Sequence, residues 1–119
     1  MKFFSPKFLL HLEGAFIFLT ACILYAHLHF SWLIFALLIL APDLSMLAYL
    51  VNKRAGTLCY NLFHTYSIPL LIFLVLLYLG KAEDYGIVLI WVAHIGIDRL
   101  LGYGIKYETA FKDTHFQRL

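Results

Sequence analysis

The chain has 119 residues, of which 63% are hydrophobic and 13% are charged, and its net charge at pH 7 is +2. A soluble domain carries about 25% charged residues, so this composition, with a mean hydropathy of +0.85, excludes an ordinary soluble globular domain. The small net charge also excludes a nucleic-acid-binding protein of the usual basic kind. The sequence therefore predicts an integral membrane protein whose main partner is the lipid bilayer.

Four apolar stretches are each long enough for a transmembrane helix, which needs about 20 residues. In chain order they run from about Pro6 to Leu28, Trp32 to Val51, Gly56 to Leu79, and Tyr85 to Gly102 or Gly104. The remainder, Ile105 to Leu119, is expected to lie at the membrane interface. The predicted fold is all-α: one domain, residues 1–119, forming an integral membrane bundle of four transmembrane helices with a short interfacial C-terminal tail.

Basic residues predict the orientation, because they gather on the cytoplasmic side of a membrane. One predicted side of the bundle holds seven of them, and the other holds only Lys81, which Glu83 and Asp84 balance. Both termini are therefore expected in the cytoplasm, in a multi-pass protein of a bacterial inner membrane. The seven are Lys2, Lys7, Lys53, Arg54, Lys106, Lys112 and Arg118.

Each predicted helix carries polar residues that are costly in a bilayer, and such residues suggest a functional site. When the helices alternate in direction, these residues fall at a similar depth, roughly 8–15 Å from the cytoplasmic end of each helix. We therefore expect them to converge in the cytoplasmic half of the bundle. They are Glu13 in the first helix, Asp43 in the second, Asn61 and His64 in the third, and His94, Asp98 and Arg99 in the fourth.

The spacing of these residues favours a metal site. His94 and Asp98 are four residues apart on one helix face, as ligands of a shared metal often are. Pro42 and Pro69 are expected to interrupt their helices, and broken helices at membrane depth commonly line sites. If ionised, the carboxylates would leave the site with a charge of about −2, which either a divalent cation or protonation must compensate.

Carboxylate and imidazole ligands suit zinc, iron or manganese. The leading hypothesis is a metal-dependent membrane hydrolase that acts on a lipid or another amphipathic substrate. In that hypothesis His64, His94 and Asp98 hold the metal, and Glu13 or Asp43 is the last ligand or the general base. Substrate binding is assigned to Asn61, Arg99 and His115, with Arg99 suited to a phosphate or carboxylate headgroup.

Two other functions remain open on the sequence alone. The same groups would serve a proton-coupled transport or relay subunit. Because four helices enclose only a narrow pathway, this function would need a homo-oligomer. They would also serve a structural or accessory membrane protein, because polar residues often simply join membrane helices. Among the individual residues, Asn61 is more typical of such joining, Arg99 could reach to the interface, and His115 could belong to a solvated end.

Several strings of the sequence resemble the bacterial family catalogued as domain of unknown function 4260. They are Ala41-Pro42-Asp43-Leu44-Ser45-Met46-Leu47, Tyr60-Asn61-Leu62-Phe63-His64-Thr65-Tyr66, Ala93-His94-Ile95-Gly96-Ile97-Asp98-Arg99, and the ending from Gly102 to His115. The resemblance covers nearly the whole chain. It implies a small bacterial membrane protein with four spans, and it implies no particular reaction.

Overall fold

The structure is a computed structural model that describes residues 5–104, and those residues form helices and turns with no strand. An all-α fold is thus confirmed. The α-helices are α1 (Pro6–His27), α2 (Trp32–Leu38), α3 (Lys53–Phe63), α4 (Ser67–Leu79) and α5 (Tyr85–Leu101), and two 3₁₀ helices are η1 (Ala41–Leu50) and η2 (Ala82–Asp84).

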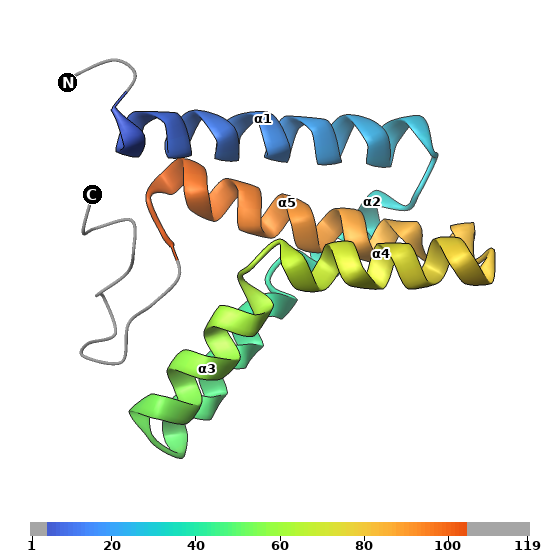
Figure 1. Ribbon diagram of the computed structural model, residues 1–119. Helices are drawn as coiled ribbons and strands as arrows, with labels where there is room; N and C mark the ends of the chain where they lie inside the picture. The colour runs from blue at the N-terminus through green and yellow to red at the C-terminus, as the bar shows by residue number, and fades with distance from the viewer. Residues whose placement is uncertain (1–4, 105–119) are drawn as a thin grey trace.

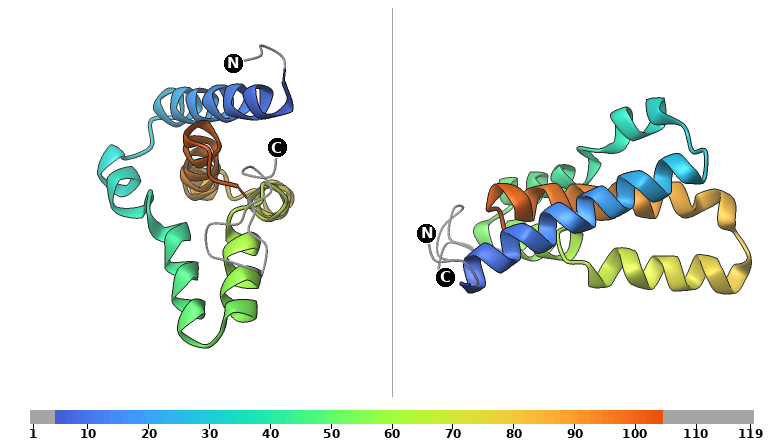
Figure 2. Two further views of the ribbon diagram at one scale, coloured as in Figure 1. Left: turned by 90° about the vertical axis from the view of Figure 1, so that its left-hand side faces the viewer. Right: turned by 90° about the horizontal axis from the view of Figure 1, so that it is seen from above.

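Three long helices form one layer, in which α5 lies between α1 and α4 (Figure 1). A hairpin made of η1 and α3 points away from this layer, and the left view of Figure 2 shows the same separation. The N-terminal end of α1 and the C-terminal end of α5 lie at one end of the molecule. The turns that follow α1 and α4 lie at the other, so the chain runs back and forth along one axis.

Two glycines hold α1 tightly against α5. A Cβ atom on Gly14 would lie 2.6 Å from the backbone nitrogen of Leu100, and one on Gly96 would lie 2.8 Å from the backbone nitrogen of Phe18. Small residues allow membrane helices to approach this closely, so that backbone packs on backbone. This contact fixes the position of α5, the helix that carries His94 and Asp98.

The predicted second helix is interrupted. α2 ends at Leu38, and the chain continues from Ala41 as a 3₁₀ helix of 10 residues. Pro42 explains the interruption, because proline lacks the N–H that would bond to the carbonyl of Leu38. The Asp43 N–H instead bonds to the carbonyl of Leu40 at 3.0 Å, which leaves the carbonyl of Ile39 available to a side chain.

The predicted third helix, from Gly56 to Leu79, is wrong as a single element. Asn52 caps α3, because its side-chain oxygen accepts a hydrogen bond from the N–H of Ala55 at 2.7 Å, so the helix begins at Lys53. It ends at Phe63, and α4 leaves at an angle of 48°. Pro69, in the first turn of α4, cannot bond to the carbonyl of Thr65, so the two helices do not join.

Four complete spans are not confirmed. Two helical segments are long and apolar enough to cross a membrane, Pro6–His27 and Trp32–Leu50, and the bent pair α3–α4 would make a third if it is one broken span. α5 has 17 residues, about 26 Å at 1.5 Å per residue, slightly less than a hydrocarbon core of about 30 Å. The described residues therefore indicate a membrane protein with two or three candidate spans.

Candidate metal centre

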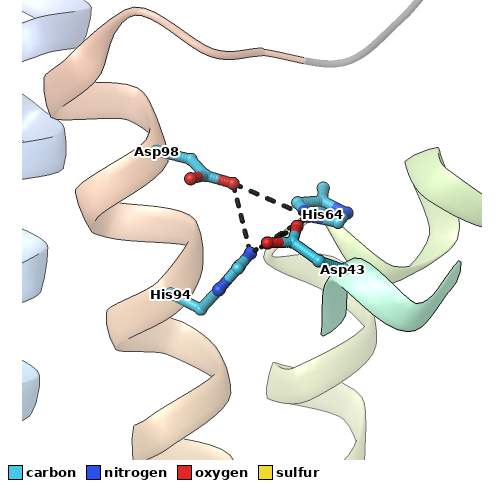
Figure 3. Close-up of side chains that lie close together, drawn as sticks. All are labelled: Asp43, His64, His94 and Asp98. Atoms are coloured by element: carbon cyan, nitrogen blue, oxygen red, sulfur yellow. Dashed lines mark hydrogen bonds and ion pairs between the residues drawn. The ribbon is translucent and has the colours of Figure 1, made fainter. Parts of the chain in front are cut away.

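Four side chains from three elements meet where the two helix interruptions lie beside α5. Asp43 comes from η1, His64 from the end of α3, and His94 and Asp98 from α5 (Figure 3). One ligand atom from each residue lies within 4.8 Å of the others. The predicted convergence of these four residues is thus present, although the polypeptide around them is bent where continuous helices were expected.

The distances that involve the two imidazole Nε2 atoms are short. Nε2 of His64 lies 3.0 Å from Oδ1 of Asp43 and 3.6 Å from Oδ2 of Asp98. Nε2 of His94 lies 3.1 Å and 3.2 Å from the same two atoms, and the two Nε2 atoms are 3.1 Å apart. Ligands about 2.0–2.2 Å from a tetrahedral zinc ion are about 3.3–3.6 Å from each other, so the group has the size of a single metal site.

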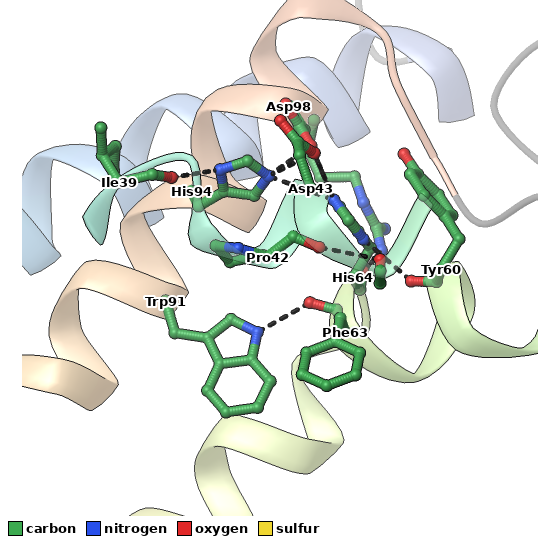
Figure 4. Close-up of polar contacts among 11 residues, drawn as sticks. Ile39, Pro42, Asp43, Tyr60, Phe63, His64, Trp91, His94 and Asp98 are labelled. Carbon is green, nitrogen blue, oxygen red and sulfur yellow. Dashed lines mark hydrogen bonds and ion pairs between the residues drawn. The ribbon is translucent and has the colours of Figure 1, made fainter. Parts of the chain in front are cut away.

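Backbone carbonyls decide which imidazole nitrogens face the centre. Nδ1 of His64 lies 2.8 Å from the carbonyl oxygen of Tyr60, and Nδ1 of His94 lies 2.6 Å from that of Ile39 (Figure 4). A carbonyl oxygen only accepts, so each Nδ1 must carry a proton and donate it. In a neutral imidazole the Nε2 atom then has a free lone pair, as in most histidines that bind metals.

The group is buried on its imidazole side and more open on its carboxylate side. His64 and His94 are 3% and 2% exposed, whereas the side chains of Asp43 and Asp98 are 36% and 19% exposed. With neutral imidazoles, four acceptor atoms face one another and two of them are negative. That arrangement is unfavourable without a cation or shared protons, and it could hold a metal ion.

Neighbouring side chains fix the bent backbone around the ligands. Trp91 donates from Nε1 to the carbonyl of Phe63 at 2.7 Å, and Arg99 donates from Nη2 to the carbonyl of His64 at 3.1 Å. Tyr60 stacks on the imidazole of His64 with ring centroids 3.8 Å apart. Carbonyls freed by the end of α3 are thus bonded by side chains from α5, which holds His64 in place.

The other predicted site residues lie outside the group of four. Glu13 is exposed on α1, so the structure does not place it among the candidate ligands. Asn61 is half-buried on α3. Arg99 is only 9% exposed, with its guanidinium carbon 5.5 Å from the centre of the Tyr66 ring, so its side chain packs inside the fold. His115 lies outside the described residues.

Sequence reasoning missed the groups that support the ligands. The supporting roles of Tyr60 and Trp91 were not predicted, and neither was the carbonyl that bonds to His94, which belongs to Ile39. The four-residue spacing from Tyr60 to His64 was the available signal, because such residues are neighbours on a helix. The partner of His94, 55 positions away, has no such local signal.

A family model matches residues 7–119, and its description is domain of unknown function DUF4260. The chain belongs to the DUF4260 family. All four converging residues lie within the matched range. No curated protein and no solved structure matches the chain, so the chemistry of this DUF4260 member has to be argued from the site itself.

Proposed function

We propose that this DUF4260 protein is a membrane metalloprotein whose ion is held by Asp43, His64, His94 and Asp98. One observation carries the proposal: both imidazoles donate from Nδ1 to backbone carbonyls and therefore direct their Nε2 lone pairs toward the same point as two carboxylates. A nitrogen and oxygen ligand set of this kind suits zinc, iron or manganese. Zinc is the ion that we propose, because two imidazoles and two carboxylates make the four ligands of a tetrahedral site.

The reaction we propose is metal-dependent hydrolysis of a lipid or another amphipathic substrate. A divalent ion here would supply Lewis-acid chemistry, which polarises a carbonyl or phosphoryl oxygen. Asp43 has the more exposed of the two carboxylates, at 36%, so it is the ligand best placed to release the ion and meet water. In this scheme Asp43 accepts the proton of water as the water oxygen bonds to the acyl carbon or phosphorus, and then returns the proton to the leaving oxygen.

Metal content tests the first part of the proposal. The purified wild-type protein, stripped with a chelator and reloaded with zinc, should retain one equivalent of zinc per chain, and Co²⁺ in its place should give the visible absorption of a tetrahedral site. Asp43→Asn should lower the zinc affinity, because the amide oxygen is a weaker ligand than a carboxylate. Glu13→Gln is the matched control and should retain zinc as the wild type does. A wild-type protein that retains no metal would overturn the proposal.

Hydrolysis is tested separately from metal binding. Zinc-loaded protein in lipid nanodiscs should release product from a long-chain ester or a phospholipid, as measured by mass spectrometry, and a chelator should stop the release. Asp43→Asn should reduce the rate by about 10²–10⁴-fold, the usual contribution of a general base. Bound metal without hydrolysis of any of these substrates would retain the metal site and reject the hydrolase.

If no metal binds, the proton-relay function is the next candidate. The same short contacts would then hold shared protons between the imidazoles and the carboxylates. Proton flux into liposomes that contain the protein would support that function, and Asp98→Asn should stop the flux.

A further inference from the structure

An apolar cavity of about 200 Å³ opens directly beside the four candidate ligands. Its walls come from the three elements that carry them and from Leu38 at the end of α2. Pro42 precedes Asp43 in η1, Phe63 precedes His64 in α3, and Trp91 lies one turn before His94 in α5. In Figure 4, Phe63 and Trp91 lie on one side of Pro42, and Asp98 lies on the other, together with the imidazoles.

The cavity wall is well fixed. The rings of Phe63 and Trp91 stack with their centroids 5.5 Å apart, and the bond from Trp91 Nε1 to the carbonyl of Phe63 uses the one polar atom of the indole. Ala41, Ile87 and Ile90 complete an almost wholly apolar lining. This cavity therefore offers a ligand no hydrogen bond, whereas the neighbouring group offers only polar atoms.

We propose that this cavity binds the hydrocarbon chain of an amphiphile whose polar end lies at the metal ligands. The inference rests on the proposed metal site and names the part of the substrate that the site does not itself contact. Size selects this occupant, since a helix from a second copy, about 10 Å across, would not enter a cavity of about 200 Å³. The apolar cavity adjoins the polar group of ligands. This favours a molecule with both a polar and an apolar part over bilayer lipid, which would fill the cavity whether or not the metal is bound.

Trp91 provides a direct measurement, because it forms part of the cavity wall. The chain has two tryptophans, and Trp32→Phe removes the other, which lies on α2, and keeps an aromatic ring there. The probe is a straight-chain alkyl hydroxamate that carries bromine on the chain, because hydroxamates bind divalent metals and bromine quenches indole fluorescence on contact. The matched probe is the alkane with the same brominated chain, which has no group that binds a metal.

In zinc-loaded protein, we expect the hydroxamate to quench Trp91 in a saturable manner, stoichiometric with the zinc. The alkane should quench weakly and without saturation, in proportion to its content in the detergent micelle. Ala41→Phe, which fills the cavity, should abolish the saturable component of the quenching. If that variant fails to fold, Ile87→Phe fills the cavity from another helix and should have the same effect. Leu37→Phe is the matched control, since Leu37 is 71% exposed and does not line the cavity.

The outcomes separate this inference from the metal site on which it rests. Zinc content is measured in every sample, so absence of zinc would reject the proposed function and this inference together. Bound zinc with a hydroxamate that alters the Co²⁺ spectrum but leaves Trp91 unquenched would reject the chain site alone. Equal quenching by hydroxamate and alkane would show that ordinary lipid fills the cavity, and a hydroxamate that does not bind the zinc-loaded protein would likewise reject the inference.

Discussion

The two histidines are held in different ways although they face the same point. His64 bonds within its own helix, to the carbonyl of Tyr60, whereas His94 reaches across to Ile39 in another element. In both cases the bond fixes the ring and directs Nε2 to the centre. The two buried Nε2 acceptors lie 3.1 Å apart, so they require positive charge between them. The source of that charge can be measured.

Asp98→Asn separates a metal ion from shared protons as that source. If zinc is bound, the variant loses a ligand and should have a lower melting temperature, because ligand binding stabilises the folded state by about 2.7 kcal/mol at a hundredfold excess over its dissociation constant. A chelator should then lower the melting temperature of the wild type toward that of the variant. The measurement is thermal unfolding in detergent with and without chelator.

The contrary result has an equally clear meaning. Without a cation, removing one carboxylate charge relieves repulsion, and the variant should be as stable as the wild type or more stable. Combined with a wild type that is indifferent to chelator, this would leave the relay or structural function. Glu13→Gln serves as the control, because Glu13 is exposed and lies outside the group.

At the level of the helices, the site depends on a hairpin that carries two of its ligands. η1 bears Asp43, the residue after α3 is His64, and these two elements pack closely because Gly56 admits the ring of Tyr49. A 3₁₀ helix of 10 residues is long for its kind, since runs beyond about 3–4 residues are uncommon. Packing against α3 therefore has to support η1.

Gly56→Ala should reduce zinc affinity although Gly56 touches no ligand. The new Cβ would lie 2.2 Å from Cγ of Tyr49, so η1 would have to move relative to α3, which separates Asp43 from His64. Zinc titration of the stripped protein measures the effect. Leu58→Ala, on the same helix at a residue that is 59% exposed, should bind zinc as the wild type does, and equal affinity in all three proteins would contradict the argument.

The contact between α1 and α5 gives a second test on helix packing. Gly14→Ala would place a Cβ 2.6 Å from both Cβ of Arg99 and the backbone nitrogen of Leu100, so the helices must separate. Overpacking of this kind costs about 1–3 kcal/mol, and the melting temperature should fall accordingly. Thr20→Ala, on the exposed face of α1, should change stability by less than about 0.5 kcal/mol. Equal melting of the two variants would show that the close contact is unimportant.

For the whole molecule, the arrangement of the ends suits the predicted alternation of direction. The turns after α1 and α4 lie at the same end of the fold, opposite the beginning of α1 and the end of α5 (Figure 1). The asymmetry of basic residues remains the basis for placing the beginning of α1 and the end of α5 on the cytoplasmic side. The bent hairpin does not alter this expectation, because Lys53 and Arg54 lie at its tip.

Reporter fusions test the orientation. A reporter fused at His29 should be active outside the cytoplasm, and one fused at the C-terminus should be active inside it, because basic residues are retained on the cytoplasmic side. Alkaline phosphatase and green fluorescent protein provide the complementary signals. A cytoplasmic signal at His29 would reverse the predicted topology and move the metal site to the other half of the membrane.

The sequence by itself determined the membrane character, the all-α class and the set of polar residues from which the four converging ones come. Composition indicates a bilayer, where backbone polar groups are satisfied only within helices or closed barrels. The length of the apolar stretches then favours helices, because a transmembrane strand needs only about 9–11 residues. The rise of 1.5 Å per residue places Asp43, His64, His94 and Asp98 at one depth, whichever way each helix is rotated about its axis.

Only the tertiary structure decided which polar residues belong together and how the chain bends to unite them. Depth is a property of one helix, but facing is a relation between helices, so Glu13 shared the predicted depth and still lies exposed, outside the group. Pro42 and Pro69 predicted interruptions without predicting where the freed carbonyls would go. The choice of Ile39 and Phe63 as partners of His94 and Trp91 depends on the packing of α5 against both breaks, and no local pattern encodes it.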